Sequence, residues 1–206
     1  EGITMLKEGV HPRSIEVAGL QAGMPMPPLA LQDEVSLSLG LHVAEQTKKD
    51  LAAEGKAYTE HPGMAVVRQL CEIGRIGKKA GKGFYDYGLA DDERGKQLWP
   101  GLAQMFAVAA VQPEQKELID RLMFAQANEA VRCLDEGVLR SVADGNIGSI
   151  FGWGFAPFQG GALQFINAMG AQAFVARSRA LAAKFGSRFE PAAGVVKLAE
   201  AGGRFE

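Results

Sequence analysis

The chain has 206 residues, of which 47% are hydrophobic and 22% are charged, and this composition is typical of a globular protein with a core of its own. Its formal net charge of −2 argues against nucleic acid as a main partner, and no apolar run is long enough for a membrane span. The two cysteines lack a C-x-x-C spacing, which favours a reducing compartment, so the cytoplasm is the expected location.

The first half of the chain is predicted to form five helices. Some of them begin at a proline, and some of them end before a glycine. In chain order they are residues 1–8, one from Pro12, one from Pro28, one from about Ser38, and residues 64–73, with a polar loop over 53–63.

A stretch rich in glycine and lysine follows at 74–87 and ends in an aromatic cluster. Such a loop can cradle phosphate, but the phosphate-loop pattern fails here because Phe84 stands where a hydroxyl is needed. A structural turn is the favoured interpretation, and a phosphate site stays open as the alternative. The candidate turn residues are Gly77, Lys78, Gly81, Gly83, Phe84 and Tyr85. Residues 89–96, which include the acidic run 91–93, are the expected linker.

The second half begins with a long amphipathic helix that runs from Pro113 to a stop at Gly137. Ser141 is predicted to cap the next helix, with Asp144 three residues on. A glycine- and aromatic-rich turn covers 152–161. Three further helices are expected at 162–169, 171–185 and 193–201. Because no alternating run indicates a strand, the predicted fold class is all-α.

The two halves look like copies of one unit. Glu1, Leu6, Glu8, Gly9 and Val10 match Glu129, Leu134, Glu136, Gly137 and Val138 at a constant shift. Near the other end, Pro62, Val66, Val67, Gly74 and Arg75 match Pro191, Val195, Val196, Gly203 and Arg204. A common order and a nearly constant shift favour a tandem duplication, with copies at 1–96 and 97–206. On this hypothesis, about 15 residues of the first long helix should precede Glu1.

Few residue types suggest chemistry. His11, His42 and His61 lack metal-ligand spacing, and no nucleophile signature is present, so neither a catalytic residue nor a metal site is predicted. Cys71 and Cys133 are interpreted as small buried apolar residues. Asp33 and Glu34 are interpreted as flanking a helix. Met24, Pro25 and Met26 combine rigid prolines with adaptable methionines and could line either a pocket or a helix interface.

Three motifs together resemble one family. Residues 77–87 are similar to the signature G-[RK]-K-x-G-x-G-F-Y-x-Y that closes the helical domain of 3-hydroxyacyl-CoA dehydrogenases. Residues 128–137 and 152–161 resemble the second helical copy of multifunctional fatty-acid oxidation enzymes, and this likeness covers essentially the whole chain. The resemblance implies two tandem domains of the 6-phosphogluconate dehydrogenase C-terminal-like fold, without the Rossmann domain.

The resemblance also implies a function. The family oxidises (3S)-3-hydroxyacyl-CoA to 3-ketoacyl-CoA with NAD, in fatty acid β-oxidation. Its catalytic residues and dinucleotide glycines belong to segments that this sequence does not contain, so the chain alone is expected to be inactive and to bind no cofactor. Met24, Pro25 and Met26 match the family's turn near the acyl substrate, although Pro27 replaces a glycine there, and Ser36 replaces another glycine further on.

The implied partners are the NAD domain, the acyl-CoA substrate, a thiolase subunit and a second copy of the chain. The competing hypothesis is a non-enzymatic helical interaction or oligomerisation module. A third hypothesis, coenzyme A phosphates bound at the lysines of the 74–87 stretch, is disfavoured by the missing phosphate-loop pattern. Residue types do not reveal the chain-length preference.

Overall fold

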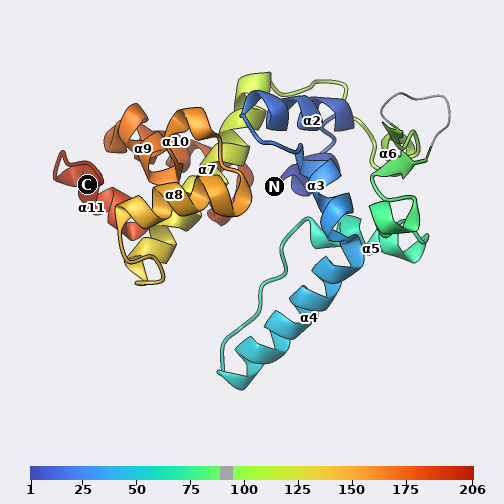
Figure 1. Cartoon of the computed structure of the whole chain (residues 1–206), viewed down its shortest axis with the longest axis horizontal. Helices are drawn as coiled ribbons and strands as arrows, with labels where there is room; N and C mark the ends of the chain where they lie inside the picture. Colours follow the sequence, from blue (N-terminus) through green and yellow to red (C-terminus); the bar gives the residue numbers. More distant parts are fainter. Residues whose placement is uncertain (89–94) are drawn as a thin grey trace. The chain divides into compact units, whose positions relative to one another are not determined.

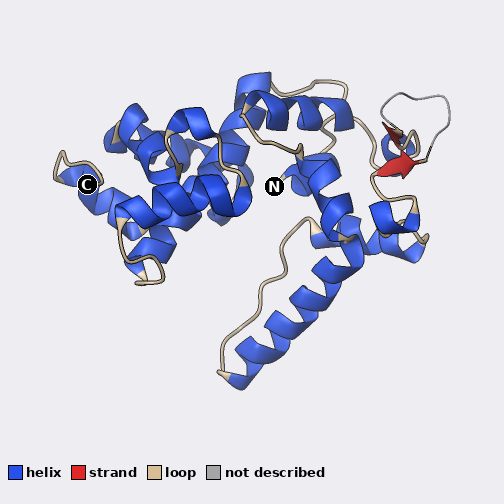
Figure 2. Cartoon of the chain, in the orientation of Figure 1, coloured by secondary structure: helices blue, strands red, loops and turns tan. Residues whose placement is uncertain are grey.

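The computed structural model describes residues 1–88 and 95–206. Most of the predicted linker at 89–96, with its acidic run 91–93, therefore lies outside the described residues. Helices dominate the described chain, and the two strands form one short antiparallel pair (Figure 2). The prediction of an all-α fold is confirmed.

Contacts divide the chain into two compact units. Unit 1 comprises Glu1–Ala18 and Met26–Gln115, and unit 2 comprises Gly19–Pro25 and Lys116–Glu206. The short segment 19–25 thus packs with unit 2, although the residues on both sides of it belong to unit 1. The proposed copies at 1–96 and 97–206 concern sequence homology and stay a prediction.

Unit 1 contains the elements that the prolines and glycines predict. They are α1 (Gly2–Lys7), α2 (Pro12–Gln21, whose last three residues fall in unit 2), α3 (Pro28–Val35), α4 (Leu37–Ala53), α5 (Met64–Glu72), β1 (Tyr85–Tyr87), β2 (Lys96–Leu98) and α6 (Leu102–Met105). The core of unit 1 is made by fully buried side chains such as Met5, Leu29, Leu70 and Phe84. Helix α4 contributes little to it, since Leu37 is its one buried residue; Figure 1 shows α4 reaching well beyond α5.

The β1–β2 pair was not predicted. Tyr85 lies opposite Leu98, and Tyr87 lies opposite Lys96. Each strand has three residues, too few to display an alternating pattern in the sequence. The pairing is a tertiary consequence of how the preceding turn is held.

Unit 2 consists of five helices packed around an aromatic core. They are α7 (Gln115–Asp135), α8 (Val142–Trp153), α9 (Ala162–Met169), α10 (Ala171–Phe185) and α11 (Ala193–Glu200). The bounds of α9 and α10 agree with the prediction, and Ser141 Oγ accepts the backbone N–H of Asp144 at 3.0 Å, which confirms the predicted cap. In the core, the rings of Phe124 and Phe174 stack with their centroids 4.5 Å apart.

No helix among residues 1–88 and 95–206 combines the length and the apolar character that a membrane crossing requires.

Candidate functional site

The glycine–lysine turn is tied to unit 1 by a buried carboxylate. Asp33, on α3, is 1% exposed. Its Oδ1 accepts the backbone N–H of Phe84 at 2.8 Å, and its Oδ2 accepts that of Tyr85 at 2.9 Å. The hydroxyl of Tyr87 donates to the same Oδ2 at 2.9 Å. Asp33 therefore does not merely flank a helix, as the sequence suggested, but satisfies three donors of the turn.

Close approach explains a glycine of the turn. A Cβ added at Gly83 would lie 2.0 Å from Asp33 Oδ1, so only glycine lets the carboxylate reach the two following N–H groups. The other predicted turn residues lie beside it: Gly77 precedes a short 3-10 turn (Lys78–Ala80), Gly81 ends that turn at φ +75°, and Phe84 is buried at its base.

Arg75 holds the opposite side of the turn. Its Nε donates to the carbonyl of Gly83 at 2.6 Å, and its Nη2 donates to the carbonyl of Tyr85 and to Asp86 Oδ1. The guanidinium carbon lies 4.1 Å from the centre of the Trp99 ring, a cation–π contact. Arg75 and Asp33 thus bind the same short segment.

A second buried carboxylate, Glu16, binds the aromatic end of the turn. Its oxygens accept the N–H groups of Leu29 at 2.7 Å and Ala30 at 3.3 Å, and Tyr85 Oη donates a short hydrogen bond to Oε2. Burial raises the pKa of Glu16 above its ordinary value, against the opposing effect of these hydrogen bonds. Burial likewise raises the pKa of the Asp33 carboxyl, and those of the two tyrosine hydroxyls facing the carboxylates.

One lysine of the turn, Lys78, is held by a neighbouring carboxylate. Lys78 Nζ pairs with Glu34 Oε2 at 2.8 Å, in an exposed ion pair. An added phosphate would have to compete with this carboxylate and would lie near the buried carboxylate of Asp33. The geometry therefore favours the structural interpretation of the turn.

The second predicted site, Met24–Pro25–Met26, is divided between the units. Met24 packs against the core of unit 2, and Pro25 belongs to the same unit, whereas Met26 belongs to unit 1. Pro27, which replaces a glycine of the family motif, sits at φ −69° and ψ 157° as the residue before α3. That extended conformation suits proline, so the replacement causes no strain.

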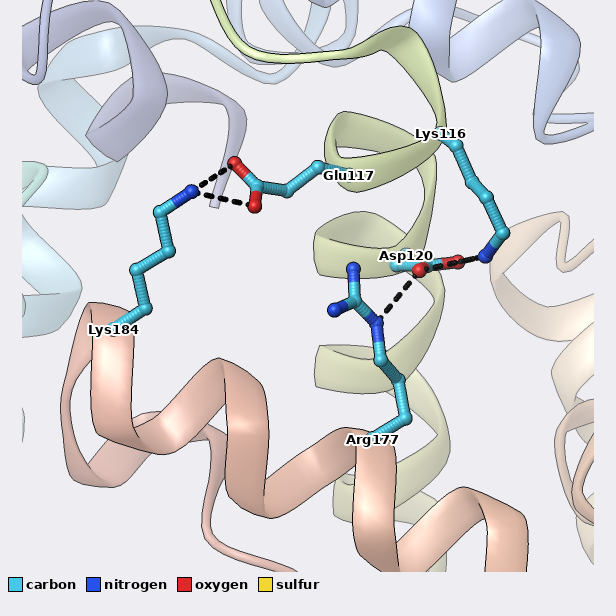
Figure 3. A network of polar contacts seen from close by, with 5 residues as sticks. All are labelled: Lys116, Glu117, Asp120, Arg177 and Lys184. Carbon is cyan, nitrogen blue, oxygen red and sulfur yellow. Dashed lines mark hydrogen bonds and ion pairs between the residues drawn. The ribbon is translucent and has the colours of Figure 1, made fainter.

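In unit 2, charged groups join α7 to α10 (Figure 3). Asp120 is 6% exposed and accepts from Arg177 Nε at 2.8 Å and from Lys116 Nζ at 2.9 Å. One end of the pair of helices carries the ion pair of Lys184 with Glu117 at 2.6 Å. Each carboxylate comes from α7 and its partner from α10, apart from Lys116 within α7, so the network fixes the register of the two helices.

Two histidines accept hydrogen bonds from nearby backbone groups. His11 Nδ1 accepts the N–H of Arg13, and His61 Nδ1 accepts that of Gly63, both at 3.2 Å. Cys71 and Cys133 are free, half-buried thiols, rather than the buried ones predicted, and burial raises the pKa of each. Among the described residues, no cluster of three histidine, cysteine or acidic side chains could hold a metal ion.

A shallow depression of about 270 Å³ lies on unit 2, between α10 and α11. It is lined by Gln172, Val175, Ala176, Arg179, Val196, Ala199 and Glu200. Pockets for small ligands usually enclose larger volumes, and none of the predicted site residues lines this one.

Comparison with known proteins gives a family match in the first part of the chain. Residues 1–87 match the family model described as the 3-hydroxyacyl-CoA dehydrogenase C-terminal domain, and the match ends at the last residue of β1. The buried carboxylates of Asp33 and Glu16 and the turn that they hold all lie inside the matched residues.

Two solved structures share the fold. A 3-hydroxybutyryl-CoA dehydrogenase from Escherichia coli matches with a TM-score of 0.70 and 22% identity, over 97% of this chain and 57% of its own. The dehydrogenase part of multifunctional enzyme 1 from C. elegans matches with a TM-score of 0.58 and 16% identity, over 95% of this chain and 45% of its own. This chain thus spans 57% of the first protein and 45% of the second.

Proposed function

We propose that this chain is the substrate-binding and interface region of an NAD-dependent 3-hydroxyacyl-CoA dehydrogenase of fatty acid β-oxidation. The reaction is oxidation of (3S)-3-hydroxyacyl-CoA to 3-ketoacyl-CoA. The observation that carries the proposal is the family match over residues 1–87, which includes both predicted sites. Hydride transfer needs the acyl group fixed and shielded from water, and an apolar helical domain supplies such a wall.

The element order supports a tandem duplication within the chain. Helices α3 and α9 both have eight residues, and each is followed directly by a longer helix and then by a short one. Contacts repeat as well: α3 packs on α4 and α4 on α5, as α9 packs on α10 and α10 on α11. We infer that the second unit is a diverged copy of the first, and that it serves as a built-in partner.

The NAD cofactor belongs to another part of the enzyme under this proposal. A dinucleotide fold needs a parallel sheet with a glycine-rich turn, whereas the described residues offer a single antiparallel pair of strands. The described residues therefore do not fit NAD, and the chain's contribution is to hold the acyl-CoA side. A Rossmann domain is the partner required, a thiolase subunit is a further candidate partner, and the cytoplasm is the proposed location.

The deciding experiment pairs the chain with a NAD domain. The purified chain, mixed with NADH and acetoacetyl-CoA, should give no oxidation of NADH at 340 nm. The same chain joined to the coding sequence found upstream of residue 1 should turn over. Upstream sequence without a glycine-rich βαβ segment, or turnover by the chain alone, would contradict the proposal.

One observation favours a second candidate function, a helical interaction or oligomerisation module. On α4, Leu39 is 48% exposed and Val43 is 56% exposed, on a helix that buries only Leu37. Sedimentation of the chain with and without Leu39→Glu and Val43→Glu tests it. The module would be favoured over the enzyme by two results together. The unaltered chain would form dimers that these changes disperse, and no turnover would be seen when a NAD domain is supplied.

A further inference from the structure

Two glycine turns of unit 2 pack against each other reciprocally. One turn follows α2 and contains Gly23, and the other follows α8 and contains Gly154. A Cβ added at Gly23 would lie 2.8 Å from the Cβ of Ala156, two residues after Gly154. A Cβ added at Gly154 would lie 2.6 Å from Cγ of Pro25, two residues after Gly23. Each glycine thus lies against the residue that comes two places after the other glycine. The two contacts are reciprocal, as they are in an isologous interface between subunits.

Both glycines are required by conformation as well as by space. Gly23 has φ +90° and Gly154 has φ +76°, values that side-chain-bearing residues rarely adopt. At Gly23 the backbone N–H donates to the carbonyl of Leu20 at 3.0 Å, and the next N–H, of Met24, donates to Gly19 at 3.0 Å. The turn after α2 is therefore closed by its own hydrogen bonds.

Phe158, which follows Gly154 in the chain, also contacts the turn that contains Gly23. Its ring carbon Cε1 would lie 2.4 Å from a Cβ at Gly23, although the ring as a whole is 72% exposed. The ring thus lies edge-on to the turn and leaves the rest of its surface in solvent. Beneath the turn, Ala22 and Met24 join the buried cluster of unit 2.

We propose that Gly154 and Phe158 are positioning residues for the Met24–Pro25–Met26 turn. The proposal rests on the proposed function, in which that turn lies beside the acyl group of the acyl-CoA. Pro25 packs on Gly154 and Gly23 packs on Phe158, and these contacts within unit 2 hold Met24 and Pro25 in place. The two residues act through the turn and do not themselves touch substrate.

The contact is tested on the chain itself, with methionine methyl groups labelled with ¹³C. Phe158→Ala and Gly154→Ala should shift or broaden the signals of Met24 and Met26, assigned by single Met→Leu changes. Matched controls are Phe151→Ala, a more exposed phenylalanine of the same unit, and Gly152→Ala, where an added Cβ meets nothing within 4 Å. Pro25→Ala removes the contact from the other side and covers the case in which Gly154→Ala does not fold. Unchanged Met24 and Met26 signals in Phe158→Ala and Pro25→Ala would overturn the proposal.

A second measurement uses the chain joined to its NAD domain. Phe158→Ala should raise KM for the 3-hydroxyacyl-CoA about tenfold with a smaller change in kcat, because a displaced turn costs about 1.4 kcal/mol of ground-state and transition-state binding alike. Phe151→Ala should leave both constants unchanged. Shifted methionine signals with unchanged KM would overturn the role in substrate positioning, although the contact itself would stand. Absence of turnover in the unaltered joined enzyme would instead count against the proposed function.

Discussion

Asp33 and Asn167 occupy the same place in their respective units. Each is the sixth residue of an eight-residue helix, α3 in unit 1 and α9 in unit 2. Each accepts the backbone N–H of a phenylalanine that follows the last helix of its set: Phe84 donates to Asp33 at 2.8 Å, and Phe205 donates to Asn167 at 2.9 Å. The side-chain oxygen at this position fastens the segment that closes the unit, in both units alike.

The first prediction follows from the burial of Asp33. Asp33→Ala would leave the N–H groups of Phe84 and Tyr85 without an acceptor, and each buried unsatisfied donor costs about 1–3 kcal/mol. We expect unit 1 to lose about 2–5 kcal/mol of unfolding free energy. Urea unfolding followed by the fluorescence of Trp99, in a Trp153→Phe background, measures this loss in unit 1.

The neighbouring carboxylate provides the control for that measurement. Glu34 makes only the exposed ion pair with Lys78, and such pairs contribute about 0–1 kcal/mol. Glu34→Ala should therefore change the unfolding free energy by less than about 1 kcal/mol. Equal losses in Asp33→Ala and Glu34→Ala would show that the turn is not held as described.

The second prediction concerns pH and Glu16. Burial raises the folded-state pKa of Glu16 above 4.5, so the folded state keeps a proton that the unfolded state releases as pH rises above that value. The stability contribution of Glu16 is therefore fully present below the unfolded pKa and falls as pH rises through the folded pKa. The groups that face its carboxyl are the Tyr85 hydroxyl, the N–H groups of Leu29 and Ala30, and the charge of Lys96.

Glu16→Gln cannot titrate, so it isolates this effect. The difference in unfolding free energy, wild type minus Glu16→Gln, should decrease as pH rises above 4.5. Unfolding curves of unit 1 at a series of pH values measure the difference, and the shared titration of Asp33 cancels in it to first order. A difference that rises with pH would mean that the hydrogen bonds outweigh burial.

Much of this fold could be predicted from the sequence, because residues next to the helix ends determine where the helices begin and end. Pro12 and Pro28 begin helices α2 and α3, Gly9 and Gly137 follow helix ends with positive φ, and Ser141 caps α8. These signals act within one turn of helix, so they need no tertiary information.

The buried carboxylates could not be recognised so easily, because their partners lie far away in the chain. Asp33 binds N–H groups 51 and 52 residues away, and Tyr85 lies 69 residues from Glu16. The available signal was periodicity: Asp33 falls on the same face of α3 as Leu29 and Ala30, which are buried. The adjacent Glu34 masked that signal, because the two acidic residues together were interpreted as flanking a helix.

The third prediction addresses the charged network of α7 and α10. Asp120 is nearly buried and accepts from both Arg177 and Lys116. Asp120→Asn removes the charge and should cost unit 2 about 2–4 kcal/mol, since two cations lose a buried partner. Glu117→Gln, at the more exposed pair with Lys184, should cost under about 1 kcal/mol. Trp153 fluorescence, in a Trp99→Phe background, reports unfolding of unit 2.

A double-mutant cycle separates the Asp120–Arg177 pair from its surroundings. Asp120→Asn, Arg177→Gln and the double variant should give a coupling energy above about 1 kcal/mol. A coupling near zero would show that Lys116 alone balances the charge of Asp120. Added salt should reduce the Glu117–Lys184 contribution more than that of Asp120–Arg177, because the lysine of the former is 59% exposed.

The fourth prediction is a stabilising change at Ser36. Among the described residues, Ser36 is the non-glycine residue with positive φ, at φ 81° and ψ 125° between α3 and α4. A side chain there is strained by about 1–3 kcal/mol, whereas glycine adopts such values freely. Ser36 Oγ donates to the carbonyl of Ile76 at 3.1 Å, a partly exposed hydrogen bond that offsets about 1 kcal/mol of the strain.

Ser36→Gly should therefore raise the unfolding free energy of unit 1 by about 1 kcal/mol. Ser38→Gly should instead lower the unfolding free energy. Ser38 is the second residue of α4, and glycine in a helix costs about 0.5–1 kcal/mol. Both are read from Trp99 unfolding curves in the Trp153→Phe background. Both substitutions remove the 2.9 Å hydrogen bond between Ser36 Oγ and Ser38 Oγ, so the loss of that bond is common to the two variants. Destabilisation by Ser36→Gly as large as that by Ser38→Gly would show that the hydroxyl contact, rather than the strain, governs this junction.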